Sequence, residues 1–376
     1  MRIGILTLPL HTNYGGILQA YALQTVLEGM GHDVVLLNKE KIVIPQGKKL
    51  VIEYIKRFIK KYILLKKVRF NAEKEDLPLY KHCSQYTQTF IDKYIHYCIH
   101  DDYDKIDNTV LQLDAIIVGS DQIWRPRYIK EVLKEKRTNA YLKFAKKWKI
   151  KRISYAASFG TDVWEYSQIS TNSIKSLIDK FDAVSVREES GVLLCKKYFD
   201  VIASHVLDPT MLLSSDVYSS LIDKCTEVKK HNKMLFNYVL DSNEKIDTLI
   251  KNVLKDKQLN MYQLSDGSDY SSGTIQPYVE EWLAAIKYAD FIITDSFHAC
   301  VFCIIFHKPF IVIGNERRGY GRFKSLMEMF KIEKNLIKDP SEYNSDIDYS
   351  IPLHTYTILS KWQMDSMNFL KNALNK

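Results

Sequence analysis

The sequence predicts an α/β protein of two domains, each built on a parallel sheet. Its 376 residues exceed the roughly 100–200 residues of a typical single domain. Short apolar runs alternate with segments of helical period, which is the pattern of βαβ units. Several predicted strands end in small or polar residues, at the sheet edge where open α/β sheets bind ligands.

The N-terminal domain is predicted over residues 1–215 and opens with a βαβ unit. Residues 2–8 form a short apolar run typical of a buried parallel strand. Apolar residues then recur at helical spacing over 17–30, and a second strand is predicted at 33–37. Later strands of this domain are predicted at 113–118, 153–156 and 183–186, and residues 206–210 close the series.

The C-terminal domain is predicted over residues 216–350. Its strands are predicted at 234–240, 261–264, 290–294 and 309–313, and its helices at 242–255, 278–288 and about 299–306. Residues 351–376 are predicted to carry a last amphipathic helix, because Leu359, Trp362 and Leu370 share one broad face over 358–374.

The net charge of +8 is concentrated in one segment. Residues 48–70 hold nine Lys or Arg against Glu53 alone, and the rest of the chain has 44 basic and 44 acidic residues. A nucleic-acid partner is therefore not expected, because the charge is confined to one predicted helix and no nucleic-acid motif accompanies it.

The same segment, 48–70, reads as a basic amphipathic insertion. Val51, Ile55 and Phe58 fall on one helical stripe with Tyr62 and Leu65, and lysines occupy the other side. This pattern is typical of a helix that lies on an anionic membrane surface. An ordinary domain helix with a solvated basic face explains it equally well.

Other global features indicate a cytoplasmic protein without a metal. No run of 18 apolar residues predicts a membrane span, and the N-terminal segment is too short for a signal peptide. The six cysteines lack the spacing of a disulfide scaffold. Cys300 and Cys303 lie on an apolar helix without a second pair, so they are interpreted as core thiols rather than zinc ligands.

The first strand is followed by a polar turn that contains Asn13, Gly15 and Gly16. A turn of this kind aims backbone N–H groups and a helix N-terminus at whatever lies above the sheet, and anions suit that place. The glycines are also explained by the backbone angles of the turn alone.

His298 is the sharpest candidate for catalysis. It lies just after a predicted buried strand and at the start of a helix, where an imidazole can face a cleft and move protons near neutral pH. Asp295 precedes it and is placed to orient it or to cap the helix. The alternative is that Asp295 or Ser296 is only an N-cap and His298 is a core residue.

Charged residues follow other strands. Arg187 directly follows the strand at 183–186 and is suited to grip a carboxylate or phosphate, although an ion pair with a neighbouring glutamate explains it too. Asp121 follows 113–118 and either takes a proton or caps a turn. Arg318 and Arg322 lie in a loop after the last strand, either as cations for an anionic ligand or as solvated residues.

Seven motifs, taken together, resemble the polysaccharide pyruvyl transferase family over roughly residues 1–330. In chain order they are NYGGILQ (13–19), VGSDQIW (118–124), SYAASFG (154–160), VREESG (186–191), LDPT (207–210), TDSFHA (294–299) and RGYGRF (318–323). Single motifs of this kind are weak, but seven in the right order are specific.

The resemblance implies two Rossmann-like domains that face a cleft, a GT-B-like fold. It implies transfer of pyruvate from phosphoenolpyruvate, the donor, to a sugar acceptor expected to be lipid-linked, with no cofactor or metal. His298 would be the general acid/base, supported by Asp295 and Asp121. The substrate would be bound by Arg187, Asn13, Gly15, Gly16, Ser120, Ser296, Arg318 and Arg322. Family members often carry Arg where this chain has Ser296, so donor binding would depend more on Arg318 or Arg322.

Two other functions stay open at this point. One is a nucleotide-sugar glycosyltransferase on the same fold. The other is a non-catalytic scaffold for polysaccharide assembly at a membrane surface. Under the family reading, segment 48–70 would hold the protein peripherally on the inner face of the membrane, where a lipid-linked acceptor is delivered.

Overall fold

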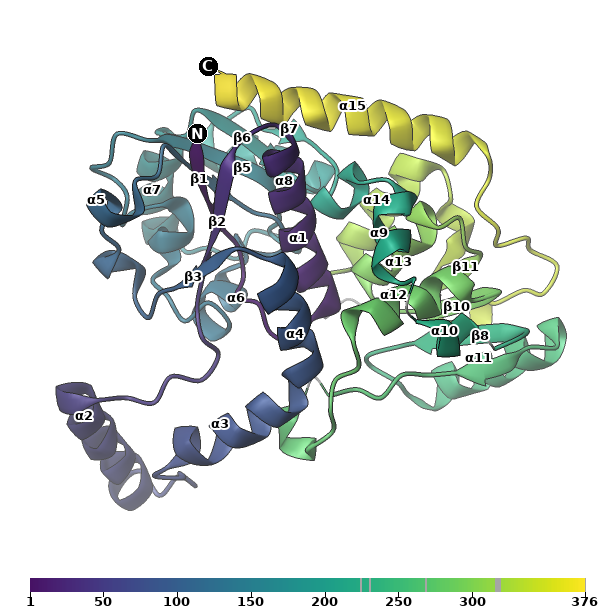
Figure 1. Cartoon of the computed structure of the whole chain (residues 1–376), viewed down its shortest axis with the longest axis horizontal. Helices are drawn as coiled ribbons and strands as arrows, with labels where there is room; N and C mark the ends of the chain where they lie inside the picture. Colours follow the sequence, from purple (N-terminus) through teal and green to yellow (C-terminus); the bar gives the residue numbers. More distant parts are fainter. Residues whose placement is uncertain (224, 230, 268, 315–318, 376) are drawn as a thin grey trace.

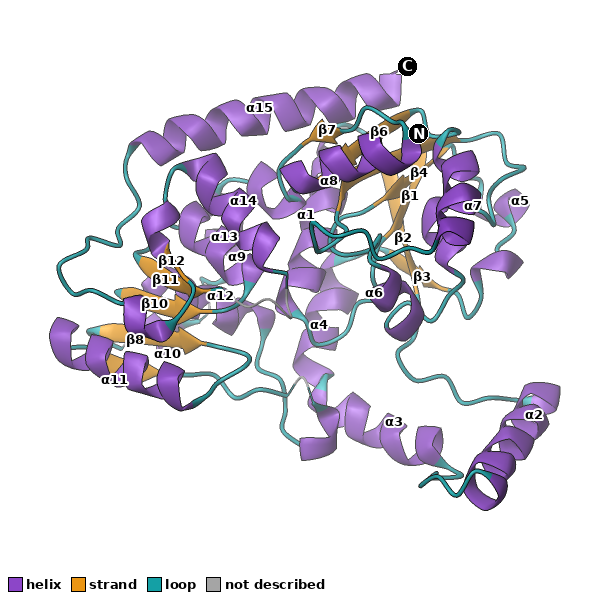
Figure 2. Cartoon of the chain, turned by 180° about the vertical axis from the view of Figure 1, so that it is seen from behind, coloured by secondary structure: helices purple, strands orange, loops and turns teal. Residues whose placement is uncertain are grey.

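The computed structural model describes residues 1–376 except 224, 230, 268, 315–318 and 376. Two parallel sheets form the two halves of the molecule, and helices pack against both (Figures 1 and 2). The predicted α/β class is thereby confirmed. Among the described residues, no helix has the length and apolar character needed to cross a bilayer.

The first sheet has seven strands in the order β3-β2-β1-β4-β5-β6-β7, and every paired neighbour is parallel. Its strands are β1 (Arg2–Leu6), β2 (Asp33–Asn38), β3 (Tyr97–Ile99), β4 (Ala115–Val118), β5 (Lys151–Ala157), β6 (Ala183–Val186) and β7 (Ser204–His205). β1 and β4 are continuous apolar runs because helices cover both faces of the sheet.

The helices of this half are α1 (Tyr14–Gly29), α2 (Gly47–Phe58), α3 (Ala72–Cys83), α4 (Gln85–Tyr94), α5 (Asn108–Leu111), α6 (Pro126–Glu131), α7 (Gln168–Ile178) and α8 (Glu189–Leu194). α1 starts three residues earlier than its apolar period predicts, because the side-chain oxygen of Asn13 accepts the Gly16 N–H at 3.2 Å and caps the helix. α2 continues into a short π-helix, η1 (Ile59–Ile63), which confirms the helix predicted within 48–70.

The second sheet has five strands in the order β12-β11-β10-β8-β9, again parallel. They are β8 (Met234–Tyr238), β9 (Asn260–Tyr262), β10 (Phe291–Thr294), β11 (Phe310–Ile313) and β12 (Leu336–Ile337). The accompanying helices are α9 (Ser215–Leu221), α10 (Thr226–Lys229), α11 (Glu244–Lys257), α12 (Val279–Tyr288), α13 (Phe297–Ile305) and α14 (Tyr320–Phe330). Short 3₁₀ and π segments connect the elements in both halves: η2 (Tyr103–Lys105), η3 (Arg137–Tyr141), η4 (Cys195–Phe199), η5 (Pro209–Leu212), η6 (Tyr270–Ser272), η8 (Glu333–Asn335) and η9 (Pro340–Glu342).

The last helix, α15 (His354–Asn375), starts beside the second half and returns along the first (Figure 1). Its Ser366 hydroxyl accepts the Leu207 N–H at 3.0 Å, and Lys151 Nζ donates to the Leu374 carbonyl at 2.7 Å. The helix therefore braces the chain just after β7, immediately before Asp208.

Candidate functional site

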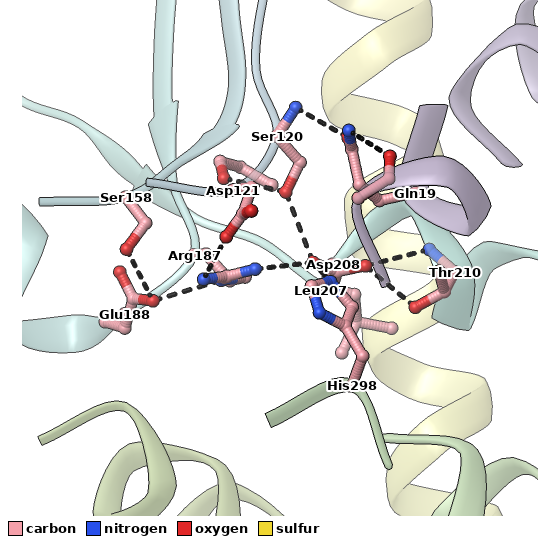
Figure 3. Close-up of polar contacts among 12 residues, drawn as sticks. Gln19, Ser120, Asp121, Ser158, Arg187, Glu188, Leu207, Asp208, Thr210 and His298 are labelled. Atoms are coloured by element: carbon pink, nitrogen blue, oxygen red, sulfur yellow. Dashed lines mark hydrogen bonds and ion pairs between the residues drawn. The ribbon is translucent and has the colours of Figure 1, made fainter. Parts of the chain in front are cut away.

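The candidate site lies between the two halves, where the carboxyl ends of β4, β6 and β7 meet the start of α13 (Figure 3). Because parallel strands end at the same edge of a sheet, residues distant in sequence converge there. Ser120 and Asp121 come from the end of β4, Arg187 from β6, Asp208 from beyond β7, and His298 from α13.

Asp208 is the centre of this site and is buried. One carboxylate oxygen, Oδ1, accepts the Thr210 N–H at 3.1 Å and its hydroxyl at 2.7 Å. The other, Oδ2, accepts from the Ser120 hydroxyl at 3.2 Å and from Arg187 Nη1 at 2.8 Å. His298 Nε2 lies 3.6 Å from the same Oδ2. One carboxylate thus joins the arginine of the first half to the histidine of the second.

Arg187 is enclosed by three carboxylates. Besides Asp208, its Nε donates to Glu188 at 3.0 Å, and its Nη2 lies 3.5 Å from Asp121 Oδ1. Burial alone would lower the pKa of Arg187, but the three carboxylates raise the pKa above its ordinary value. The ion pair with a neighbouring glutamate, the alternative explanation of Arg187, is therefore present with Glu188, and contact of Arg187 with a donor stays a prediction.

His298 is seated between Asp208 and the first turn of α1. A Cβ placed on Gly15 would lie 2.0 Å from His298 Nδ1, so only a glycine lets the helix start approach the ring this closely. Next to it, Tyr14 stacks on Trp282 at 5.3 Å and donates its hydroxyl to the Pro277 carbonyl at 2.9 Å. These contacts fasten the start of α1 to the second half.

Arg187 and Arg322 share one aromatic ring. The guanidinium carbons of Arg187 and Arg322 lie 4.2 and 5.3 Å from the centre of the Phe297 ring. Burial, followed by the charge of Arg187, lowers the pKa of Arg322 to about 10. Both arginines line a cavity of about 10 Å³ with Asp208 and Phe297, which holds about one water. Arg318, the other predicted cation, lies outside the described residues.

Asp208 is a carboxylate beside His298, and the orienting role expected of Asp295 stays a prediction. The Asp295 carboxylate accepts the Leu240 N–H at 2.7 Å and the Asp241 N–H at 3.1 Å, which ties it to the end of β8. Ser296 is the N-cap of α13, and its hydroxyl accepts the Ala299 N–H at 3.5 Å. The N-cap role that the sequence offered for Ser296 is thus present in the structure.

Sequence reasoning also missed several supporting residues. The Gln19 side chain accepts the Ser120 N–H at 3.0 Å and donates to the Thr7 hydroxyl at 3.0 Å, which ties α1 to the end of β4. Ser158 donates to Glu188 at 2.9 Å. The available signal was that residues 120 and 158 follow predicted strands, although only residue 120 was interpreted as functional.

The arrangement suits an anionic ligand and proton transfer. The first turns of α1 and α13 meet at Gly15 and His298, so two helix N-termini, each with a partial positive charge, lie next to each other. Two buried arginines add full charges, and a histidine beside a carboxylate can move a proton. Among the residues that the structure describes, no group of three or more His, Cys, Asp or Glu is arranged to hold a metal ion.

Comparison with known proteins gives one family and a common fold. The model of the family "polysaccharide pyruvyl transferase" matches residues 13–317. HepE from Anabaena, solved with UDP and glucose, is 10% identical, with a TM-score of 0.54 over 100% of this chain and 99% of that one. A putative UDP-N-acetylglucosamine 2-epimerase from Listeria monocytogenes is 9% identical, with a TM-score of 0.51 over 98% and 90%. No curated protein sequence matches. The structural likeness confirms the GT-B-like fold.

Proposed function

Because this chain belongs to the polysaccharide pyruvyl transferase family, we propose that it transfers pyruvate from phosphoenolpyruvate to a sugar of a surface polysaccharide or its lipid-linked precursor. The product would be a pyruvate ketal. The observation that carries the proposal is the pairing of His298 with Asp208 beside two buried arginines. It unites a proton carrier with cations suited to a donor that has both a carboxylate and a phosphate.

The reaction balances with two proton transfers. Two acceptor hydroxyls form C–O bonds to the central carbon of the enolpyruvyl group, and the C–O bond to phosphate breaks. One hydroxyl proton moves to the donor methylene, which becomes the methyl group. The other leaves with the phosphate. We assign these transfers to His298, while Asp208 orients the imidazole and stabilises its charged form.

We assign donor binding to the helix starts and to Arg322. Arg187 already donates to Asp208 and Glu188, so in this proposal it mainly fixes the carboxylates and contributes its charge at longer range. Asp121 Oδ1 lies 3.5 Å from Arg187 Nη2. We propose that this carboxylate stabilises positive charge that develops at the ketal carbon.

The test is a coupled assay. The protein is incubated with phosphoenolpyruvate and a saccharide acceptor, phosphate release is measured, and the product is examined by NMR for a ketal methyl signal. Phosphate release that needs the acceptor, gives the ketal and is lost in His298→Ala supports the proposal. Equal turnover by His298→Ala removes the assigned role of the histidine.

A nucleotide-sugar glycosyltransferase is the second candidate function, because the second half of the molecule contains a large pocket. It measures about 610 Å³ and lies at the carboxyl ends of β8, β10 and β11, where Asn243, Lys245 and Lys338 line it with Asp295 and Gly314. HepE, which shares the fold, was solved with UDP and glucose. Thermal stabilisation by a nucleotide sugar, without stabilisation by phosphoenolpyruvate, would favour this candidate.

A further inference from the structure

We propose that residues 47–65, here called the α2 arm, dock on an anionic lipid bilayer. The arm comprises α2, η1 and the two residues that follow η1. It projects from the body of the protein, to which loops and α3 connect it (Figures 1 and 2). The inference depends on the proposed function only for its purpose, which is to bring the enzyme to a lipid-linked acceptor.

The arm presents its apolar face to solvent, the reverse of an ordinary domain helix. Nine large apolar side chains are between 40% and 85% exposed: Val51, Ile52, Ile55, Phe58, Ile59, Tyr62, Ile63, Leu64 and Leu65. An exposed apolar surface of this extent is a mark of an interaction site.

Arg57 and Tyr54 fasten the arm to the segment that follows it. Arg57 donates to the Phe70 carbonyl and pairs with Glu73, and its side chain is only 13% exposed. The Tyr54 hydroxyl donates to Asn71 Oδ1 at 2.5 Å. Because the nine apolar side chains are exposed rather than packed against a core, an ordinary domain helix does not explain the arm.

The charge of the α2 arm favours an anionic lipid surface as its binding partner. Exposed lysines flank the apolar face at positions 56, 60, 61, 66 and 67. The acidic residue of the arm, Glu53, already pairs with Lys56 at 2.7 Å. A second copy of this chain would bring the same excess of positive charge to the contact, which opposes self-association. Anionic headgroups with acyl chains beneath them satisfy both the lysines and the apolar face.

The position of the arm agrees with delivery of a membrane-bound acceptor. The chain leaves the sheet for the arm after Asn38, at the carboxyl end of β2. The site residues follow β4 and β6 at the same edge of the same parallel sheet. The connection to the arm and the residues Asp121 and Arg187 therefore lie at one edge of the same sheet.

Vesicle co-sedimentation of the full chain tests this inference without any substrate. The probes are vesicles of phosphatidylcholine mixed with phosphatidylglycerol, and vesicles of phosphatidylcholine alone. We expect binding to the anionic vesicles only, weakened by salt. Lys60→Gln with Lys61→Gln should weaken binding about 25-fold, at about fivefold per lysine. Ile55→Asp with Phe58→Asp should weaken it at least about tenfold.

The matched control changes an exposed isoleucine and lysine elsewhere, through Ile169→Asp with Lys175→Gln on α7, and should bind as the unmodified protein does. Equal binding by the arm variants would overturn the inference, and so would arm-dependent dimers without vesicle binding. Phosphate release with a water-soluble acceptor should be unchanged in the arm variants. The two proposals can therefore fail separately. Vesicle binding does not depend on pyruvyl transfer, and pyruvyl transfer to a water-soluble acceptor does not depend on vesicle binding.

Discussion

His298 Nε2 lies 3.6 Å from Asp208 Oδ2, so an imidazole of the second half faces a buried carboxylate of the first. The same carboxylate accepts from Arg187, whose cation lies over Phe297, the residue before His298. The histidine is therefore correctly placed only when the two halves are together.

Replacing His298 by Gln should remove the proton carrier while keeping a polar side chain of similar reach. We expect turnover with phosphoenolpyruvate and acceptor to fall about a hundred- to ten-thousandfold, the usual contribution of general acid–base catalysis. Phosphate release measures this, and thermal unfolding shows that the variant is folded. His205→Gln is the control, because that histidine contacts the Arg187 carbonyl and the Trp362 ring and not Asp208. An equal loss in the control would contradict the assignment.

Gly15→Ala should displace His298. The new Cβ would lie 2.0 Å from Nδ1, so the ring or the start of α1 has to move, and a displacement of about 1 Å can cost about a hundredfold in rate. Overpacking should also cost about 1–3 kcal/mol of stability.

Gly29→Ala, at the other end of the same helix, is the control. Its new Cβ would meet nothing within 4 Å, so the free energy of unfolding should rise by up to about 1 kcal/mol. Similar behaviour of the two variants in turnover and urea unfolding would refute the packing argument.

The loss of folding stability at acid pH should depend on Asp208. Burial tends to raise the pKa of this carboxyl, but His298 and Arg187 lower it well below its usual range. The folded pKa is below the unfolded value of about 3.9, so the carboxylate contributes stability above that pH and loses it as pH falls. Asp208→Asn should cost about 3–5 kcal/mol near neutral pH and flatten the loss below about pH 4. Urea unfolding at a series of pH values measures both the loss of stability and its pH dependence. Asp162→Asn, at an exposed position, is the control and should be unaffected.

The sequence predicted the long elements well and the site only in part. β6 is found at its predicted residues, because a buried parallel strand is a run of apolar residues. β3 and β12 were missed, since two or three residues carry no period, and β7 lies just before the segment predicted to close the series at 206–210. The sequence showed Asp208 only as part of the motif at 207–210. Its place beside Ser120 and Arg187 follows from the strand order, which brings the ends of β4, β6 and β7 together.

Arg322→Ala should weaken donor binding if this buried cation meets phosphoenolpyruvate. Loss of a charged hydrogen bond costs about 1.5–3 kcal/mol, so KM for the donor should rise at least about tenfold while KM for the acceptor changes little. Arg322→Lys should recover part of the affinity, because burial and Arg187 still surround a cation there. An unchanged donor KM in both variants would exclude Arg322 from donor binding.

Ser366→Ala should show that α15 supports the site from behind. The hydroxyl of Ser366 accepts the buried Leu207 N–H at 3.0 Å, one residue before Asp208. Without it that donor loses its partner, which costs about 1–3 kcal/mol in urea unfolding. Turnover should fall as well, because the segment that carries Asp208 loosens. Ser176→Ala on α7 removes only an exposed bond to the Ser173 carbonyl and should change neither. If Ser366→Ala loses stability but keeps full turnover, the helix braces the fold without positioning the carboxylate.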